Sequence, residues 1–212
     1  MSDALDHLAG PAGDLLARVD DLLARVGAPD DDPVWPLLRR MRALPGEAVA
    51  ALTGTLRAAP LAEAGGVLRA RAATCTDVRS AVIAPVAWEG PAGESYAARA
   101  ARLGADAAAA GEALAATGRF ADEAAAWIER TRERLAVVLA ETLVSADAVA
   151  VVLGTDNAAR AAATIATRVL STLDTAISDG ETLRQPLLAG DRGRSGAPPL
   201  PANYERVTRL GY

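Results

Sequence analysis

The chain has few aromatic residues, one cysteine, one histidine and no lysine. Aromatic side chains make up 3% of the 212 residues, and all 22 cationic side chains are arginine. Cys75 has no second cysteine in the chain, which excludes an internal disulfide. One histidine and one cysteine do not supply the ligands of a usual zinc site, and without lysine there is no phosphate-binding GxxxxGK[ST] loop.

Arrangements typical of catalytic and nucleic-acid-binding proteins are also missing. Nucleophilic catalysis of the serine–histidine kind needs a positioned base, and His7 lies near the N-terminus. The net charge of −5 gives no basic surface of the kind that sequence-independent nucleic-acid binding requires. We therefore predict a non-enzymatic protein without cofactor, metal or nucleic-acid partner.

Alanine, in contrast, accounts for about a quarter of the chain, and 51% of the residues are hydrophobic. Alanine is the best helix former and a poor strand former. The apolar share is large enough to offset the entropy of the unfolded chain. The composition predicts an all-α protein, an elongated antiparallel helical hairpin or bundle with coiled-coil-like seams and a flexible C-terminal tail.

Periodicity divides the chain into three parts. We expect residues 1–11 to form a flexible N-terminal arm and residues 12–185 a helical bundle, because apolar residues recur there at steps of three and four. Within the bundle, Gly118 is predicted to bend or break a helix and Gly180 to end the last one. The Gly-, Pro- and Arg-rich composition of residues 186–212 predicts a disordered tail.

Two apolar seams with heptad spacing run through the middle of the bundle. The first lies between residues 61 and 82, and the second begins at Tyr96 and continues for about six heptads. Arg71 is a charged member of the first seam, whose stem can pack while its head reaches water or an acidic partner. We predict helix–helix packing through Leu61, Leu68, Cys75, Val78, Val82, Leu103, Leu114, Ile128 and Leu135.

A chain reversal around Trp88 separates the two seams. Gly90 can adopt the positive φ that a reversal often needs, and Pro91 suits the first position of a helix. The sequence therefore predicts a helix–turn–helix hairpin over about residues 61–130. Trp88 either closes the turn over Tyr96 or over an alanine groove, or it belongs to a recognition surface for a partner, and these roles are compatible.

Trp88-Glu89-Gly90, between two alanine-rich heptad-patterned helices, resembles the W-x-G motif of the WXG superfamily, the helical-hairpin substrates of type VII (ESX) secretion. The longer chain looks more like actinobacterial secretion domains or PPE-type relatives. The resemblance implies a secreted substrate or its pairing partner, with Trp88, Gly90 and Tyr96 as a protein-interaction motif. It implies binding to a cognate WXG-like helical protein or a second copy, contact with the type VII ATPase, and a secreted or cell-surface location after a cytoplasmic pool.

The chain departs from that family in its export signal. Relatives often carry a Y-x-x-x-D/E sequence after the hairpin. Here Tyr96 is followed four residues later by Ala100, and Tyr204 by Thr208, so neither matches. Either the partner supplies the signal, or the protein stays in the cell.

Two other functions stay open, a cytoplasmic helical scaffold or chaperone-like adaptor, and a peripheral membrane protein. The second would use the apolar window 135–154 as an interfacial face. Glu141 and Asp147 lie inside this window, and a carboxylate at the centre of a bilayer costs about 3 kcal/mol on insertion scales. We therefore expect a buried amphipathic helix there, and no membrane contact.

Overall fold

The computed structural model describes residues 3–83 and 88–194, with side chains to residue 185. Within these ranges the chain forms helices and loops without any strand, which confirms the all-α prediction. The helices are α1 (Ala4–Arg25), α2 (Val34–Met41), α3 (Pro45–Thr55), α4 (Ala59–Val82), α5 (Pro91–Leu143), α6 (Ala146–Leu153) and α7 (Ala158–Arg194).

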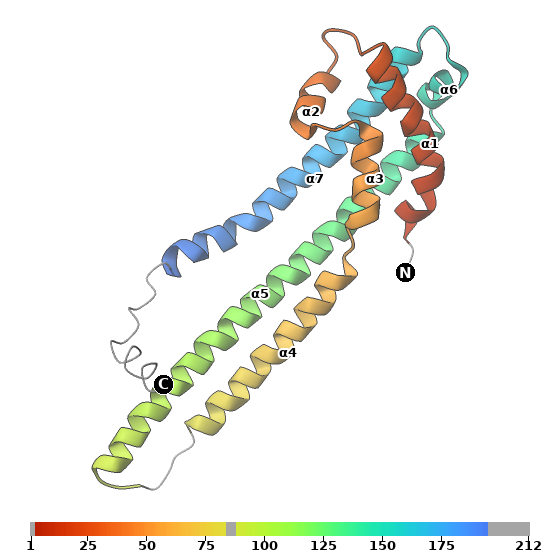
Figure 1. Cartoon of the computed structure of the whole chain (residues 1–212). Coiled ribbons are helices and arrows are strands. Elements are labelled where there is room, and N and C mark those ends of the chain that lie inside the picture. The colour runs from red at the N-terminus through yellow and green to blue at the C-terminus, as the bar shows by residue number, and fades with distance from the viewer. Residues whose placement is uncertain (1–2, 84–87, 195–212) are drawn as a thin grey trace, which may run out of the picture.

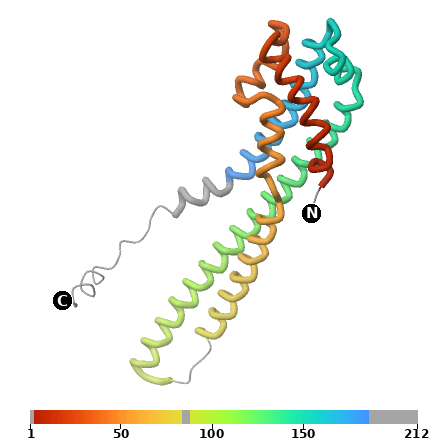
Figure 2. The backbone as a smooth tube through the Cα atoms, turned by 45° about the vertical axis from the view of Figure 1, so that its right-hand side comes forward, coloured from red at the N-terminus to blue at the C-terminus, as the bar shows by residue number. Residues whose placement is uncertain are grey.

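The helices are arranged as a head and an arm (Figure 1). The arm consists of α4 and residues 91–120 of α5, which lie side by side and extend away from the other helices (Figures 1 and 2). The head contains α1, α2, α3, α6, the rest of α5 and the first half of α7. Beyond Gly180, α7 diverges from α5, so it does not run along the arm (Figure 2).

The hydrophobic core lies in the head, where α1, α5 and α7 meet. Leu16 and Val19 of α1, Leu135 and Leu139 of α5, and Leu170 of α7 are each at most 1% exposed. Burial of one such side chain stabilises the fold by about 1.5–3 kcal/mol. α7 passes through this core on a run of alanines, whose small side chains permit the close approach.

The first residues of the chain differ from the expected flexible arm. Asp3 caps α1, because its carboxylate accepts the backbone N–H of Asp6 at 3.0 Å while the Asp6 carboxylate accepts that of Asp3 at 3.2 Å. Leu5 is 1% exposed and joins the core. α1 therefore begins at Ala4 and continues through Pro11, which we had placed before the helix.

Gly118 and Gly180 lie inside continuous helices, contrary to the expected bend and end. α5 runs unbroken for 53 residues, and Gly118 faces the backbone carbonyl of Gly65 on α4. Gly180 lies against the ring of Trp127, whose Nε1–H donates to the carbonyl of Ala176 at 2.9 Å. Each glycine lets a group of a neighbouring helix pack closer than a side chain would allow. This packing explains why neither glycine interrupts its helix.

α7 continues to Arg194, nine residues into the predicted tail of 186–212. The rest of that tail, residues 195–212, lies outside the described residues. No single described helix is long and apolar enough to cross a membrane; α5 and α6 pass that test only together, with a bend of 63° between them. The window 135–154 is thus two helices, not the one that the sequence predicted.

Candidate functional site: the arm and its aromatic turn

The turn at the end of the arm is built by two glycines around Trp88. Gly90 has a φ of 86°, in the left-handed region that favours glycine, and directly precedes the first residue of α5. A Cβ at Gly93 would lie 2.5 Å from the carbonyl oxygen of Trp88, so the chain can return this closely to α5 only with glycine there. Sequence patterns single out Gly90 but not Gly93, for which the spacing from Gly90 is the available signal.

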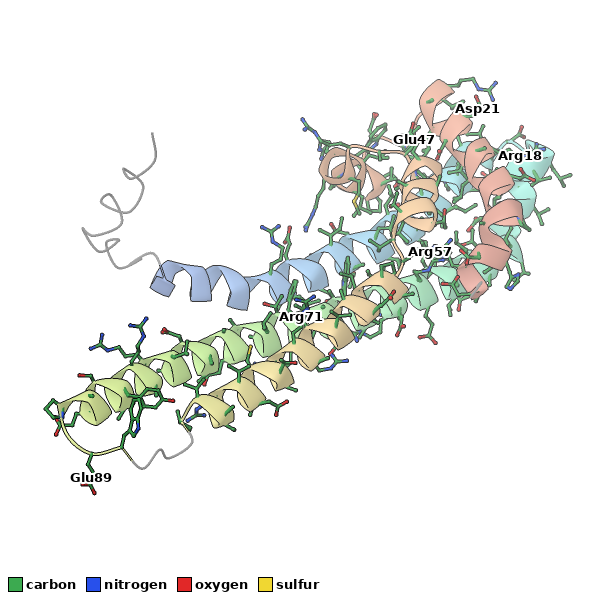
Figure 3. All side chains as sticks on the ribbon, turned by 60° about the horizontal axis from the view of Figure 1, so that its bottom comes forward. Arg18, Asp21, Glu47, Arg57, Arg71 and Glu89 are labelled. Carbon is green, nitrogen blue, oxygen red and sulfur yellow. The ribbon has the colours of Figure 1, made fainter. Side chains whose placement is uncertain are left out.

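The Trp88 side chain packs against Tyr96, two turns into α5. Their ring centroids lie 5.8 Å apart with planes inclined by 71°, the edge-to-face arrangement that aromatic pairs prefer. Trp88 nevertheless remains 64% exposed and Tyr96 45% exposed. Glu89, the middle residue of the motif, points away from the arm (Figure 3). The turn thus presents a partly fixed aromatic pair to solvent.

α4 and α5 contact each other through small residues. Gly104, Gly111 and Gly118 recur at every seventh residue of α5 and form a glycine stripe that faces α4. Cβ atoms at these positions would lie 2.7, 3.2 and 3.3 Å from their nearest neighbours on α4. Those neighbours run backwards along α4, so the two helices are antiparallel; in order they belong to Ile83, Cys75 and Arg69.

The predicted packing positions fall into three groups. Ile128 and Leu135 are buried in the head, with 3% and 0% of their surface exposed. Val78 and Leu103 lie outside the α4–α5 contact, at 46% and 52% exposure. The difference arises because α4 packs on the glycine stripe, one residue further along α5, where the helix axes can approach more closely than over leucine. The half-buried positions at the edge of the contact are Leu61, Leu68, Cys75, Val82 and Leu114.

Exposed and half-buried apolar positions gather on one side of the arm. Tyr96 and Leu103 are seven residues apart on α5, and Leu68 and Cys75 are seven apart on α4, so each pair lies on one side of its helix. Helical spacing places both pairs beside the glycine stripe on the same side, together with Val78. We call these residues the open face, defined as Leu68, Cys75, Val78, Tyr96 and Leu103.

The other side of the arm has a shallow groove floored by alanine. It comprises two adjoining hollows of about 340 and 490 Å³ that share Arg79, Ala108 and Glu112. Helical spacing puts these residues on the side of α4 and α5 away from Leu103. The two sides of the arm therefore differ in character, one lined by larger apolar side chains and the other by alanine.

The arm thus carries the two features from which a function can be argued, the aromatic turn and the open face. Among the described residues, no three His, Cys, Asp or Glu side chains are grouped so that they could hold a metal ion. Cys75 is half-buried against Gly111, and His7 is exposed on α1. Comparison with known proteins gives no matching family model, no matching curated protein and no matching solved structure.

Proposed function

We propose that this chain is a non-enzymatic helix-binding protein of the type VII (ESX) secretion kind, a secreted substrate or its pairing partner. The observation that carries the proposal is the open face, where Leu103 and Val78 keep 52% and 46% of their surface exposed at heptad positions. A partner helical protein, or a second copy, covers this face and completes a helical bundle around the arm.

The α4–α5 contact leaves part of the predicted seam uncovered, since Val78 and Leu103 remain about half exposed. In heptad packing, each a and d side chain inserts between four residues of a facing helix. The α4–α5 contact uses the glycine stripe, and α4 has just one fully buried position among its described residues, Gly65. Covering the remaining surface of a half-exposed leucine or valine gains about 1 kcal/mol, so several such positions together favour association.

The charge of Arg71, beside the open face, indicates the chemistry of the partner. Arg71 lies within the first seam and is exposed, and it takes part in none of the ion pairs of the described residues. An acidic side chain on the partner opposite Arg71 satisfies the guanidinium while the Arg71 stem packs with the apolar positions. The partner is therefore an apolar helix pair with an acidic residue near the middle of its contact.

The aromatic turn supplies the second contact. Trp88 and Tyr96 present rigid aromatic surface at the far end of the arm, and such residues carry a large share of binding energy at protein interfaces. In the proposed role, the partner and the secretion machinery both bind the aromatic turn. This assignment rests on the resemblance of Trp88-Glu89-Gly90 to the W-x-G motif.

Co-purification tests the binding role. The chain is co-expressed with a small helical protein encoded beside its gene, as wild type, as Leu103→Glu and as the matched control Ala105→Glu. Ala105 is also exposed but lines the alanine groove on the other side. We expect Leu103→Glu to abolish co-purification and Ala105→Glu to retain it. A monodisperse monomer at high concentration that retains no neighbour contradicts the proposal.

Export in the native host tests the secretion role separately. We expect wild-type protein in the medium or cell wall and Trp88→Ala retained in the cell. An exclusively intracellular pool of wild-type protein supports the cytoplasmic scaffold or adaptor instead. Normal export of Trp88→Ala removes the motif from the mechanism.

A peripheral membrane protein is a second candidate, favoured by the surface of α6. Leu153, the last residue of α6, is 71% exposed, Val149 and Val152 of the same helix exceed 50%, and Val144, between α5 and α6, is 85% exposed. Flotation with liposomes tests this candidate, with Leu153→Glu as the variant that must lose binding. Wild-type protein that stays at the bottom of the gradient removes it.

A further inference from the structure

A cluster of charged groups joins the arm to the head where α3 ends. Arg132 of α5 is 4% exposed, and its guanidinium donates to both carboxylate oxygens of Asp3 at 2.5 and 2.9 Å and to Asp6 at 2.7 Å. It also donates to the carbonyl of Leu56 at 3.1 Å. Arg57, at the junction of α3 and α4 in Figure 3, donates to Asp6 at 2.7 Å. We call this cluster the clasp: Asp3, Asp6, Leu56, Arg57 and Arg132.

The clasp satisfies groups that the local fold leaves unpaired. The Leu56 carbonyl belongs to the end of α3, where the helix provides no backbone N–H to donate to it. Asp3 and Asp6 cap the start of α1, where negative charge is favoured by the helix dipole. The Arg132 guanidinium holds the pKa of Asp3 below its usual value, and that of Arg57 does the same for Asp6, so both acids stay charged.

The two sides of the clasp differ in their access to water. The Arg132 side chain is 4% exposed, whereas that of Asp3 is 43% exposed. Asp3 belongs to the first turn of a helix, the part of a helix that frays most readily. Arg132, well inside α5, is therefore the fixed half of the clasp, and the α1 turn is the half that can detach, a step that also withdraws Leu5 from the core.

The linker of residues 56–58 connects α3 to α4, and the clasp holds it through the Leu56 carbonyl and the Arg57 side chain. Beyond the linker, α4 packs on α5 through small residues with little buried apolar surface. We propose that the first turn of α1 is a releasable strap: while it binds Arg132 it fixes the linker and keeps α4 on α5, and when it detaches the linker becomes a hinge for α4. This inference does not rest on the proposed function.

Hydrogen exchange on the full chain, read by mass spectrometry, tests the strap. Asp3→Ser keeps a good N-cap for α1 but cannot form the ion pair with Arg132, which separates the two roles of Asp3. Arg132→Met removes the buried charge and retains an apolar side chain of similar length. Arg134→Met is the matched control. Arg134 lies two residues after Arg132 on α5, and the substitution removes its exposed ion pair with Asp179 of α7.

We expect amides of residues 56–70 to exchange about tenfold faster in Asp3→Ser, while the α7 core amides of residues 161–170 keep the wild-type rate. Arg134→Met leaves both regions unchanged. Unchanged exchange of residues 56–70 in Asp3→Ser overturns the proposal, and so does an equal rise in residues 161–170, because that result marks a general loss of stability. If Arg132→Met fails to fold, Asp3→Ser decides the question.

Discussion

Leu103 and Leu135 belong to the same predicted seam on the same helix, but the structure assigns very different costs to their replacement by alanine. Leu135 lies in the head and is 0% exposed, whereas Leu103 lies on the open face of the arm and is 52% exposed. Sequence periodicity gives no reason to distinguish them. The comparison therefore measures whether the open face is uncovered when the protein is alone in solution.

The magnitudes follow from burial. Leu135→Ala removes fully buried methyl groups and leaves a cavity in the head, which lowers the free energy of unfolding by about 2–5 kcal/mol. Leu103→Ala removes a side chain that is already half in water, so the lost transfer free energy is about 1 kcal/mol. The better helix propensity of alanine offsets a few tenths of a kcal/mol of that loss. The expected net cost at Leu103 is below about 1 kcal/mol.

Urea unfolding followed by circular dichroism measures both variants against the wild type, at one low and one high protein concentration. The two variants must differ by at least about 1 kcal/mol at the low concentration. Equal costs there refute the reasoning, because they mean that Leu103 is buried within the single chain. A cost at Leu103 that grows with concentration instead identifies a second copy as a partner for the open face.

Three further outcomes are expected. Gly13→Ala, inside α1 with open space around its Cβ, raises the free energy of unfolding by about 1 kcal/mol in the same urea assay. Gly93→Ala displaces the Trp88 backbone, since its Cβ would meet the Trp88 carbonyl at 2.5 Å; the indole NMR signal of Trp88 must shift while those of the other tryptophans stay. The folded-state pKa of Asp6 lies below its ordinary 3.8, so its stabilisation is present above about pH 4 and lost in stronger acid. The stability gap between wild type and Asp6→Asn must therefore shrink as the pH is lowered from 5 to 2.

The all-α class could be predicted because alanine favours helices and apolar residues recur at helical spacing. The same periodicity places Ile128 and Leu135 on one side of a helix but does not identify the head helices that bury them. In the arm the same reasoning selects Leu103, while the contact uses Gly104 one residue later. Hydrophobic periodicity gives glycine no weight, although glycine permits the closest approach of two helices. The heptad recurrence of Gly104, Gly111 and Gly118 was the signal that could have corrected the register.

The N-terminal turn could not be predicted for a different reason. Its main partner, Arg132, lies 129 residues away in the sequence, and local patterns carry no information about such a pair. Gly10 and Pro11 also look like a helix break, although α1 continues through both. A capping box with aspartate at both of its positions was the local signal for an earlier start.

The charge of Arg71 distinguishes two kinds of partner for the open face, a different protein and a second copy of this chain. A symmetric contact presents the same surface twice, so a two-fold axis near Arg71 brings two guanidinium groups together without an acid between them. A partner with an acidic residue opposite Arg71 does not bring like charges together. Arg71→Leu must therefore weaken co-purification with an acidic partner, whereas for a second copy it must strengthen self-association measured by sedimentation equilibrium. Tighter co-purification of Arg71→Leu with the neighbouring helical protein contradicts the acidic contact and leaves apolar packing as the basis of recognition.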